Sequence, residues 1–336
     1  MSRQLSPQAA CVRTRGLHSA TSSNLARRVR VPGSLIILIA LRMMLGSATS
    51  AHAGAPAHGS VYLSNLDGPV YLLAYAYDGS GHLDVSPVHI VATVPRGGGM
   101  RRKNRDLVYV VGAGIVSAVN LADETVSSVS ANNNANTATL SPDGNTLWVG
   151  WKDTVPASVP LQPFGVGIPH PVTGDDSVAT MIAFTPAHGT FYTTGGEFAA
   201  ESGNMGHIDL GTFITSRSLS DVHATGINYD PFSGSLIIAG VGRATQIDPG
   251  NPTSVISSRD DSIAGENYLV LEPDGLGHLI GTRFGSEPRL VFIDYSESGM
   301  IGSGSSIIIS APLPNSANLS GGPTLEPDVI FRSRFE

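Results

Sequence analysis

Acidic and amide side chains at three places in the chain could bind a metal ion. Asp176, Asp221 and the pair Glu266-Asn267 each stand in a polar link just before an apolar, strand-like run. Carboxylate and amide oxygens are hard ligands of the kind that Ca²⁺ takes in proteins. If the fold brings the three links together, these side chains form a calcium site. A solvated acidic rim would contain the same residue types, and the spacing does not decide between the two interpretations.

One histidine lies beside these links. His223 follows Asp221 by two residues and could act as a general base near pH 7, with a hydrogen-bonded packing role as the alternative. The chain has no G-x-S-x-G, no H-E-x-x-H and no P-loop. A metal-dependent hydrolase is therefore the enzyme class that the residues leave open, and the missing motifs favour a protein without catalysis.

Cationic and aromatic side chains supply the candidate ligand-binding residues. Two of them belong to the block RGGGMRRKNR, which could bind an anionic partner or remain a solvated loop. The tryptophan could stack on a sugar or peptide, or pack between neighbouring sheets. The candidates are Trp151, Arg101, Arg102, Arg243 and Arg283.

The first 53 residues have the pattern of a secretory signal peptide. They hold seven arginines and no Asp or Glu. The apolar run Leu35–Leu45, which Arg42 interrupts, follows the Arg27–Arg30 cluster, and the small-residue end Ala51-His52-Ala53 comes next. A basic region, a short apolar region and an A-x-A site predict cleavage after Ala53. The alternative is an uncleaved amphipathic anchor. The apolar run is too short to cross a membrane as a helix. We expect residues 54–58 to be a linker.

Charge and cysteine content exclude several classes of function for the mature chain. Removing seven of the 20 Lys and Arg residues leaves 13 against 27 Asp and Glu, a formal net charge of −14. So acidic a protein is a poor partner for nucleic acid or an anionic membrane. The one cysteine, Cys11, lies in the predicted signal peptide, so we expect no disulfide, thiolate metal site or thiol nucleophile.

The positions of short apolar runs predict an all-β repeat fold. Runs of four to six apolar residues alternate with Gly, Pro, Asp, Asn and Ser, which is typical of many short strands. Equivalent strands recur at intervals of 46, 40, 44, 45 and 43 residues, at Val61, Leu107, Leu147, Phe191, Leu236 and Leu279. Four strands in each such period indicate a β-propeller rather than a sandwich or solenoid. We predict six blades over residues 59–331, with seven as the alternative.

Three details refine this prediction. The segment Pro323–Phe331 is expected to supply the missing inner strand of the first blade and so close the ring. Residues 152–177 contain five prolines and are interpreted as an insertion. An aspartate is expected to accept backbone N–H bonds at the corner between the third and fourth strands of five units. These aspartates are Asp78, Asp123, Asp209, Asp248 and Asp294.

One repeat resembles a known family. Ser141–Val149, SPDGNTLWV, resembles the S-P-D-G-x-x-L-Y-V signature of YVTN-type, lactonase-like propeller repeats, and the resemblance extends loosely over residues 59–310. It implies the propeller fold, whereas such repeats occur in lactonases, dehydrogenase subunits, surface-layer proteins and binding proteins. The tail at residues 332–336 belongs to IFRSRFE, which resembles the I-F-x-D-G-F-E end of some secreted proteobacterial proteins, with Ser333 and Arg334 in place of Asp-Gly.

These observations lead to one expected function and two alternatives. We expect an exported bacterial propeller, in the periplasm, at the cell surface or outside the cell. It is expected to be a monomer that binds a protein, small-molecule or carbohydrate ligand through the loop face, without catalysis or a required cofactor. One alternative is a Ca-dependent lactonase-like hydrolase with its site in the central channel. The other is an accessory subunit of a periplasmic dehydrogenase. The corner Pro142-Asp143-Gly144 is expected to lie on the face away from the ligand.

Overall fold

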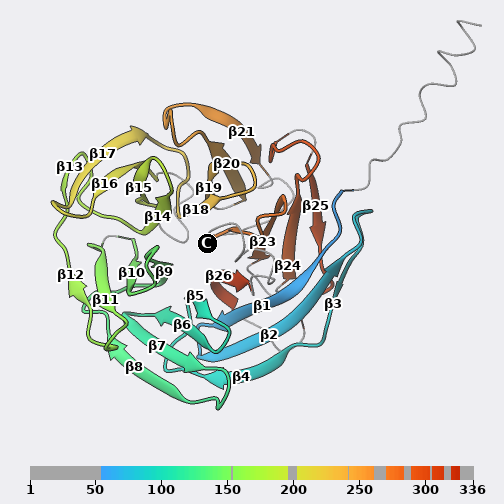
Figure 1. The fold of residues 1–336 in the computed structure, drawn as a ribbon, viewed down its shortest axis with the longest axis horizontal. Coiled ribbons are helices and arrows are strands. Elements are labelled where there is room, and N and C mark those ends of the chain that lie inside the picture. Colours follow the sequence, from blue (N-terminus) through green and yellow to red (C-terminus); the bar gives the residue numbers. More distant parts are fainter. Residues whose placement is uncertain are drawn as a thin grey trace, which may run out of the picture. The chain divides into compact units, whose positions relative to one another are not determined.

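Six β-sheets stand in a ring around a central axis (Figure 1). The computed structural model describes residues 54–152, 154–195, 203–240, 242–260, 270–283, 289–302, 305–313 and 319–325. Every regular element in these residues is a strand. The prediction of an all-β propeller with six four-stranded blades is therefore confirmed.

Each blade runs from an inner strand at the channel to an outer strand at the rim, with antiparallel neighbours. The inner strands of blades 1 to 6 are β26 (Leu319–Leu325), β5 (Gly99–Asn104), β9 (Thr137–Leu140), β14 (Met181–Thr185), β18 (Gly226–Asp230) and β22 (Glu272–Pro273). The second strands are β1 (Ala57–Asn65), β6 (Leu107–Gly112), β10 (Thr146–Gly150), β15 (Gly189–Thr193), β19 (Ser235–Gly240) and β23 (His278–Arg283).

The outer half of each blade follows the same order. The third strands are β2 (Pro69–Tyr77), β7 (Ile115–Asn120), β11 (Ala157–Pro160), β16 (Met205–Asp209), β20 (Arg243–Ile247) and β24 (Arg289–Asp294). The outer strands are β3 (Leu83–Val85) with β4 (His89–Thr93), β8 (Val126–Ser130), β12 (Ile168–Pro169), β17 (Ile214–Leu219), β21 (Val255–Asp260) and β25 (Ser306–Ile309). The short β13 (Thr173–Gly174) pairs in parallel with β17.

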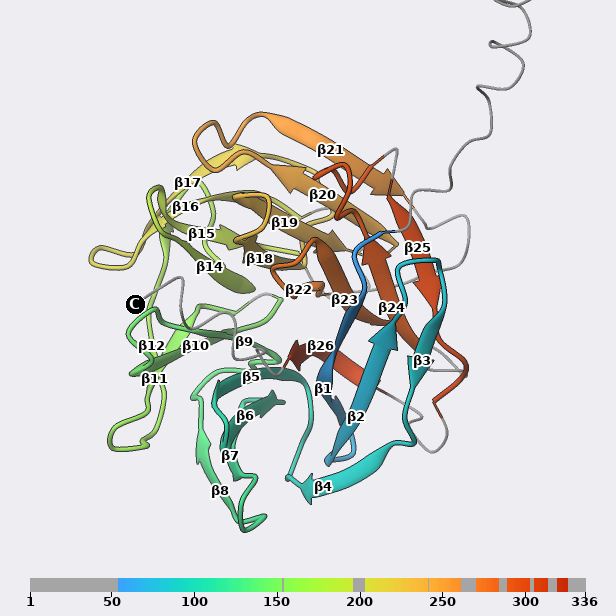
Figure 2. The same cartoon turned by 45° about the vertical axis from the view of Figure 1, so that its right-hand side comes forward.

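The two ends of the described chain meet in blade 1. β26 pairs antiparallel with β1, with Val61 opposite Leu325 and Tyr62 opposite Thr324. It lies on the channel side of β1 and also contacts β5 (Figure 2). The predicted closure is confirmed, but the strand begins at Leu319 rather than Pro323, and residues 326–331 lie outside the described residues.

Residues 152–177 were interpreted wrongly as an insertion. They contain β11 and β12, the third and fourth strands of blade 3. Proline cannot donate to a strand ladder and is tolerated at edges and strand ends. Pro160 ends β11 and Pro169 lies in the two-residue edge strand β12, so the prolines obscured a regular blade end.

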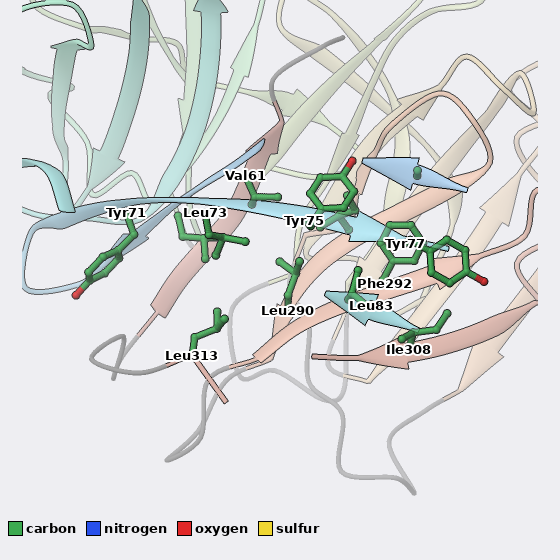
Figure 3. Close-up of a cluster of buried hydrophobic side chains, with 13 residues drawn as sticks. Val61, Tyr71, Leu73, Tyr75, Tyr77, Leu83, Leu290, Phe292, Ile308 and Leu313 are labelled. Carbon is green, nitrogen blue, oxygen red and sulfur yellow. The ribbon is translucent and has the colours of Figure 1, made fainter. Parts of the chain in front are cut away.

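The core lies between the blades. The second strands are buried on both faces, as in β19, because a sheet stands against each side. Large clusters join blades 1 and 6, 1 and 2, 2 and 3, 4 and 5, and 5 and 6. In the first of these, Tyr75 and Tyr77 of β2 lie beside Phe292 of β24 (Figure 3).

Aspartate side chains form hydrogen bonds with the backbone at the corners where the strands turn. All five predicted aspartates accept a backbone N–H two residues ahead, at 2.7 to 3.1 Å: Asp78 from Ser80, Asp123 from Thr125, Asp209 from Gly211, Asp248 from Gly250 and Asp294 from Ser296. In the Ser141–Thr146 corner, Asp143 accepts from Asn145 and Gly144 takes a φ of 68°, which glycine adopts without strain. The repeated corner is thus built from local hydrogen bonds.

Candidate functional site

A cavity of about 720 Å³ lies on the channel axis. It is lined by residues of the inner strand of every blade and by the corners that follow four of these strands. It therefore lies at the end of the channel where Pro142-Asp143-Gly144 turns, and Pro142 is one of its lining residues. The ligand-binding face predicted from the sequence is at the opposite end of the channel.

A polar triad crosses the channel in this cavity. Arg101 of β5 in blade 2 reaches across to Asn228 of β18 and Glu272 of β22, in blades 5 and 6. Arg101 Nη2 donates to Asn228 Oδ1 at 2.8 Å, and Arg101 Nη1 lies 3.2 Å from Glu272 Oε2. Asn228 Nδ2 donates to the same Glu272 oxygen at 3.1 Å and to the Leu271 carbonyl at 2.7 Å. Three blades are thereby joined through the channel.

The two charges of the triad are largely removed from water. The side chains of Arg101 and Glu272 are 10% and 19% exposed. Burial raises the pKa of Glu272 above its ordinary value, while Arg101 and Asn228 act in the opposite direction. Each charge therefore depends on the other, because a buried charge without its partner is strongly destabilising.

Apolar and ring-bearing side chains form the wall around the triad. Four prolines at or just after the ends of the inner strands of blades 3 to 6 line it: Pro142, Pro186, Pro231 and Pro273. Phe184 and Tyr229 add aromatic surface. A concave, mostly apolar wall with a few convergent polar groups is the usual form of a small-ligand site.

Hydrogen bonds join neighbouring blades, one of them at this wall and one at the other end of the channel. Thr139 Oγ1 of blade 3 donates to the Ile182 carbonyl of blade 4 at 2.5 Å, and Thr193 Oγ1 of blade 4 donates to the Thr225 carbonyl at the start of blade 5 at 2.9 Å. These two bonds tie blade 3 to blade 4 and blade 4 to blade 5.

The candidate calcium ligands do not meet among the described residues. The Asp176 carboxylate binds Arg217 at 2.6 and 3.1 Å, Asn204 at 2.8 Å and the Tyr192 hydroxyl. These contacts lower the pKa of Asp176 although its burial alone would raise it. Asp221 is exposed. Within the described part of the chain, no three His, Cys, Asp or Glu side chains are arranged to hold a metal ion.

Two of the predicted ligands, Glu266 and Asn267, lie outside the described residues. His223 stands half-buried in the link before β18 with a φ of 53°, next to the similarly twisted Asp221 at 55°. The calcium site and the catalytic role of His223 stay predictions.

The predicted ligand-binding residues are separated by the fold. Arg101 lies in the cavity, and Arg102 also lines it, while its guanidinium donates to the carbonyls of Asn104 and Arg105 and lies over the Tyr62 ring. Trp151 packs against the core cluster shared by blades 4 and 5, as its packing interpretation expects.

The other two arginines stand at strand ends. Arg243 begins β20 and is half-buried, with its Nε atom lacking a hydrogen-bond partner among the described residues. Arg283 ends β23, and its side chain is not described.

Sequence reasoning missed Asn228 and Glu272. Their positions in the sequence could have indicated them. A polar residue directly after the apolar run of an inner strand has to face the channel or the neighbouring blade. Glu272 follows the run Tyr268–Leu271 in this way. Arg101, the charged partner of Glu272, is 171 residues away in the chain. No local sequence pattern can therefore predict the pair.

A second polar pair lies on the outer part of blade 3. Ser158 Oγ lies 2.7 Å from His170 Nε2, and the His170 ring stacks on Phe213 with centroids 4.1 Å apart. Burial lowers the pKa of His170, which favours the neutral ring. This contact ties β11 to the edge of the blade and lies outside the cavity.

Comparison with known proteins identifies the fold alone. No family model and no curated protein matches the sequence. A chain in the crystal structure of a nidogen/laminin complex aligns with a TM-score of 0.57 at 11% identity, covering 80% of this chain and 98% of that one. The calcium-binding protein regucalcin from Agrobacterium tumefaciens aligns with a TM-score of 0.50 at 15% identity, covering 69% and 79%. At these identities the shared property is the propeller.

Proposed function

We propose that the mature chain is an exported binding protein that receives a ligand in the axial cavity and has no catalysis of its own. The observation that carries this proposal is the cavity itself, which every blade lines and which holds a polar triad whose members bind one another. Arg101, Asn228 and Glu272 already bind one another, so they suit recognition and support better than proton transfer.

The proposed ligand is a protein segment, small molecule or carbohydrate. The apolar, proline- and aromatic-rich wall favours a partner with apolar or ring-shaped surface. The YVTN-like repeat, the signal-peptide pattern and the secreted-type tail support an exported location. The described residues include no helix long and apolar enough to cross a membrane.

A binding screen with a matched pair of surface variants tests the cavity. The mature protein, residues 54–336, is screened by thermal shift against peptide and oligosaccharide libraries, since a ligand of the native state raises the melting temperature. Leu276→Asp changes a cavity residue that is 43% exposed, and Leu66→Asp changes a 41% exposed residue at the opposite end. We expect Leu276→Asp to weaken binding of any hit at least tenfold and Leu66→Asp to leave it unchanged. Hits that respond only to Leu66→Asp would place the site at the other end.

A calcium titration separates this proposal from the hydrolase alternative. We expect the same melting temperature in millimolar Ca²⁺ and in EDTA. A rise with Ca²⁺ that Asp221→Asn abolishes would instead support the calcium site, and lactone hydrolysis would then be assayed.

A further inference from the structure

The residues that follow the predicted cleavage site are held by blade 6. We call Gly54–Pro56 the N-terminal arm. The Ala55 N–H donates to Ser296 Oγ at 2.9 Å, and the Ala55 carbonyl lies 2.9 Å from His278 Nε2. The arm therefore approaches β1 across the corner after β24 of blade 6, although β1 itself belongs to blade 1.

Gly54 lies directly against the carboxylate of Asp294. A Cβ built on Gly54 would come within 1.7 Å of Asp294 Oδ2, so a side chain has no room there. The α-nitrogen is one bond away from the same Cα. By bond lengths alone it lies within about 5 Å of this oxygen, which is the range of an ion pair.

The Asp294 carboxylate is built into a buried polar corner. Asp294 is 5% exposed. Its Oδ2 accepts from the Tyr77 hydroxyl at 2.7 Å, and its Oδ1 accepts from the N–H and hydroxyl of Ser296 at 3.0 and 2.7 Å. His278 Nε2 lies 3.7 Å from Oδ1. A carboxylate in such a place gains from each further cationic donor.

We propose that export cuts the chain between Ala53 and Gly54 and that the new α-ammonium of Gly54 pairs with Asp294. A signal peptidase and one water molecule would break the peptide C–N bond, leaving a carboxylate on Ala53 and the ammonium on Gly54. In the uncut chain the same nitrogen is a neutral amide. Processing therefore adds a charge at the one place in the arm that faces a buried carboxylate.

This ion pair links processing to the cavity. The arm continues into His58, which lines the cavity, and His278 also binds Asp274, another lining residue, at 2.7 Å. Fixing Gly54 against Asp294 thus stiffens one side of the wall. The inference rests on the export that the proposed function includes, but it holds whatever ligand the cavity takes, so a failed ligand screen and a missing ion pair are distinguishable results.

The first experiment locates the new N-terminus. The full-length chain is produced in a Gram-negative host, and the exported protein is examined by N-terminal sequencing and intact mass. We expect the chain to begin at Gly54. A start at any other residue, or retention of the first 53 residues, overturns the proposal.

The second experiment measures the ion pair. Protein that begins with a free Gly54 amine is compared at pH 6.5, where an α-amino group is protonated, with the same protein Nα-acetylated. We expect the free amine to raise the melting temperature by about 2 to 4 °C. A chain that keeps Ala53 as its first residue carries its ammonium one residue away and should melt like the acetylated form.

Two buried aspartates provide the test of specificity. In Asp294→Asn the difference between free and acetylated protein should vanish. In Asp230→Asn it should persist, because Asp230 is an equally buried carboxylate that binds the Tyr295 hydroxyl at 2.6 Å and is not in contact with the arm. Equal melting temperatures for the two wild-type forms, or a difference that survives Asp294→Asn, overturn the ion pair. The wild-type comparison needs no substitution, so it decides the matter even if a variant does not fold.

Discussion

Arg101 shows how much of this channel depends on one side chain. Its guanidinium crosses from blade 2 to the other side of the ring, where Asn228 and Glu272 receive it. A desolvated ion pair is weak evidence of net stability, because the attraction repays a large desolvation cost. Breaking it by removing one partner is a different matter, since the remaining charge stays buried.

Arg101→Met should therefore destabilise the protein by about 3 to 5 kcal/mol. Met keeps much of the length of the side chain but leaves Glu272 without a cation. The double variant Arg101→Met/Glu272→Gln should recover most of the loss, because no buried charge remains. Arg105→Met is the control, since it removes the same charge from an exposed residue of the neighbouring corner. Urea unfolding of the wild type, the single variants Arg101→Met and Glu272→Gln, the double variant and Arg105→Met measures the coupling. Additive losses in the double variant would show that the pair does not act as a unit.

His278 is the second residue whose charge matters. It is fully buried between Asp274 and the Ala55 carbonyl. Burial alone lowers the pKa of His278, but Asp274, Asp294 and the Ala55 carbonyl outweigh it and raise the pKa above its ordinary value. Both ring nitrogens face acceptors, so the imidazolium satisfies the site completely.

The raised pKa of His278 predicts a loss of stability at alkaline pH. A group that binds its proton more tightly when folded contributes stability fully below its unfolded pKa, about 6.5, and loses it as pH rises through the folded pKa. Between these two values the free energy of unfolding should fall by about 1.4 kcal/mol per pH unit. His278→Gln should remove this slope, whereas His82→Gln should keep it, because the His82 side chain is 69% exposed. Urea unfolding of the Nα-acetylated proteins from pH 5.5 to 9 measures both, because the α-amino group of Gly54 then does not titrate in this range. A slope unchanged in His278→Gln would contradict the assignment.

At the scale of elements, the corners made the fold predictable. Pro142-Asp143-Gly144 and the aspartates of the outer corners are local signals, and each one acts in the structure through bonds over two to five residues. The spacing of the second strands then sets the blades in register. Local chemistry repeated at a constant period is sufficient to infer a propeller, because each blade must bury its faces against the next.

The two outer strands of blade 3 and the start of β26 were not predicted, for physical reasons. β11 and β12 contain prolines. A proline argues against a strand in a sequence, because it cannot donate a hydrogen bond to the strand ladder. The start of β26 at Leu319 is set by pairing with β1, some 260 residues earlier in the chain, and not by its own sequence. Strands at an edge or a closure are determined by their neighbours.

The candidate site was less predictable than the fold. Arg101 was predicted as a binding residue because it belongs to a cationic block. Its partners could not be predicted. Nothing in the local sequence distinguishes Asn228 and Glu272. They meet Arg101 only because the closed ring brings three blades together at the channel. The same holds for Asp176, whose carboxylate looked free in the sequence and is occupied by Arg217 in the structure.

At the scale of the whole molecule, stability depends on closing the ring. Four residue pairs join β26 to β1, and Leu325 packs against the cluster shared by blades 1 and 6. Without β26, β1 presents an unpaired edge to the channel. The packing between the first and last blades also loses its innermost strand. An open ring has two free sheet faces, whereas a closed ring has none.

A chain that ends at residue 318 should therefore be destabilised by an amount on the order of 5 kcal/mol. The estimate combines roughly 1 kcal/mol for each lost hydrogen bond with part of the about 1.5 to 3 kcal/mol that full burial of a leucine contributes, because Leu325 is partly buried. Since a domain has only about 5 to 15 kcal/mol in total, the truncated protein should melt far below the full chain and lose cooperativity. A chain that ends at Phe331, which removes only the predicted tail, is the control and should melt like the full chain. Adding a peptide of residues 319–331 should restore part of the melting temperature of the 318-residue form in a concentration-dependent manner, because the peptide binds only the native edge of β1. If the chain that ends at residue 318 melts at the full-length temperature, the inner strand of blade 1 is not what closes the ring.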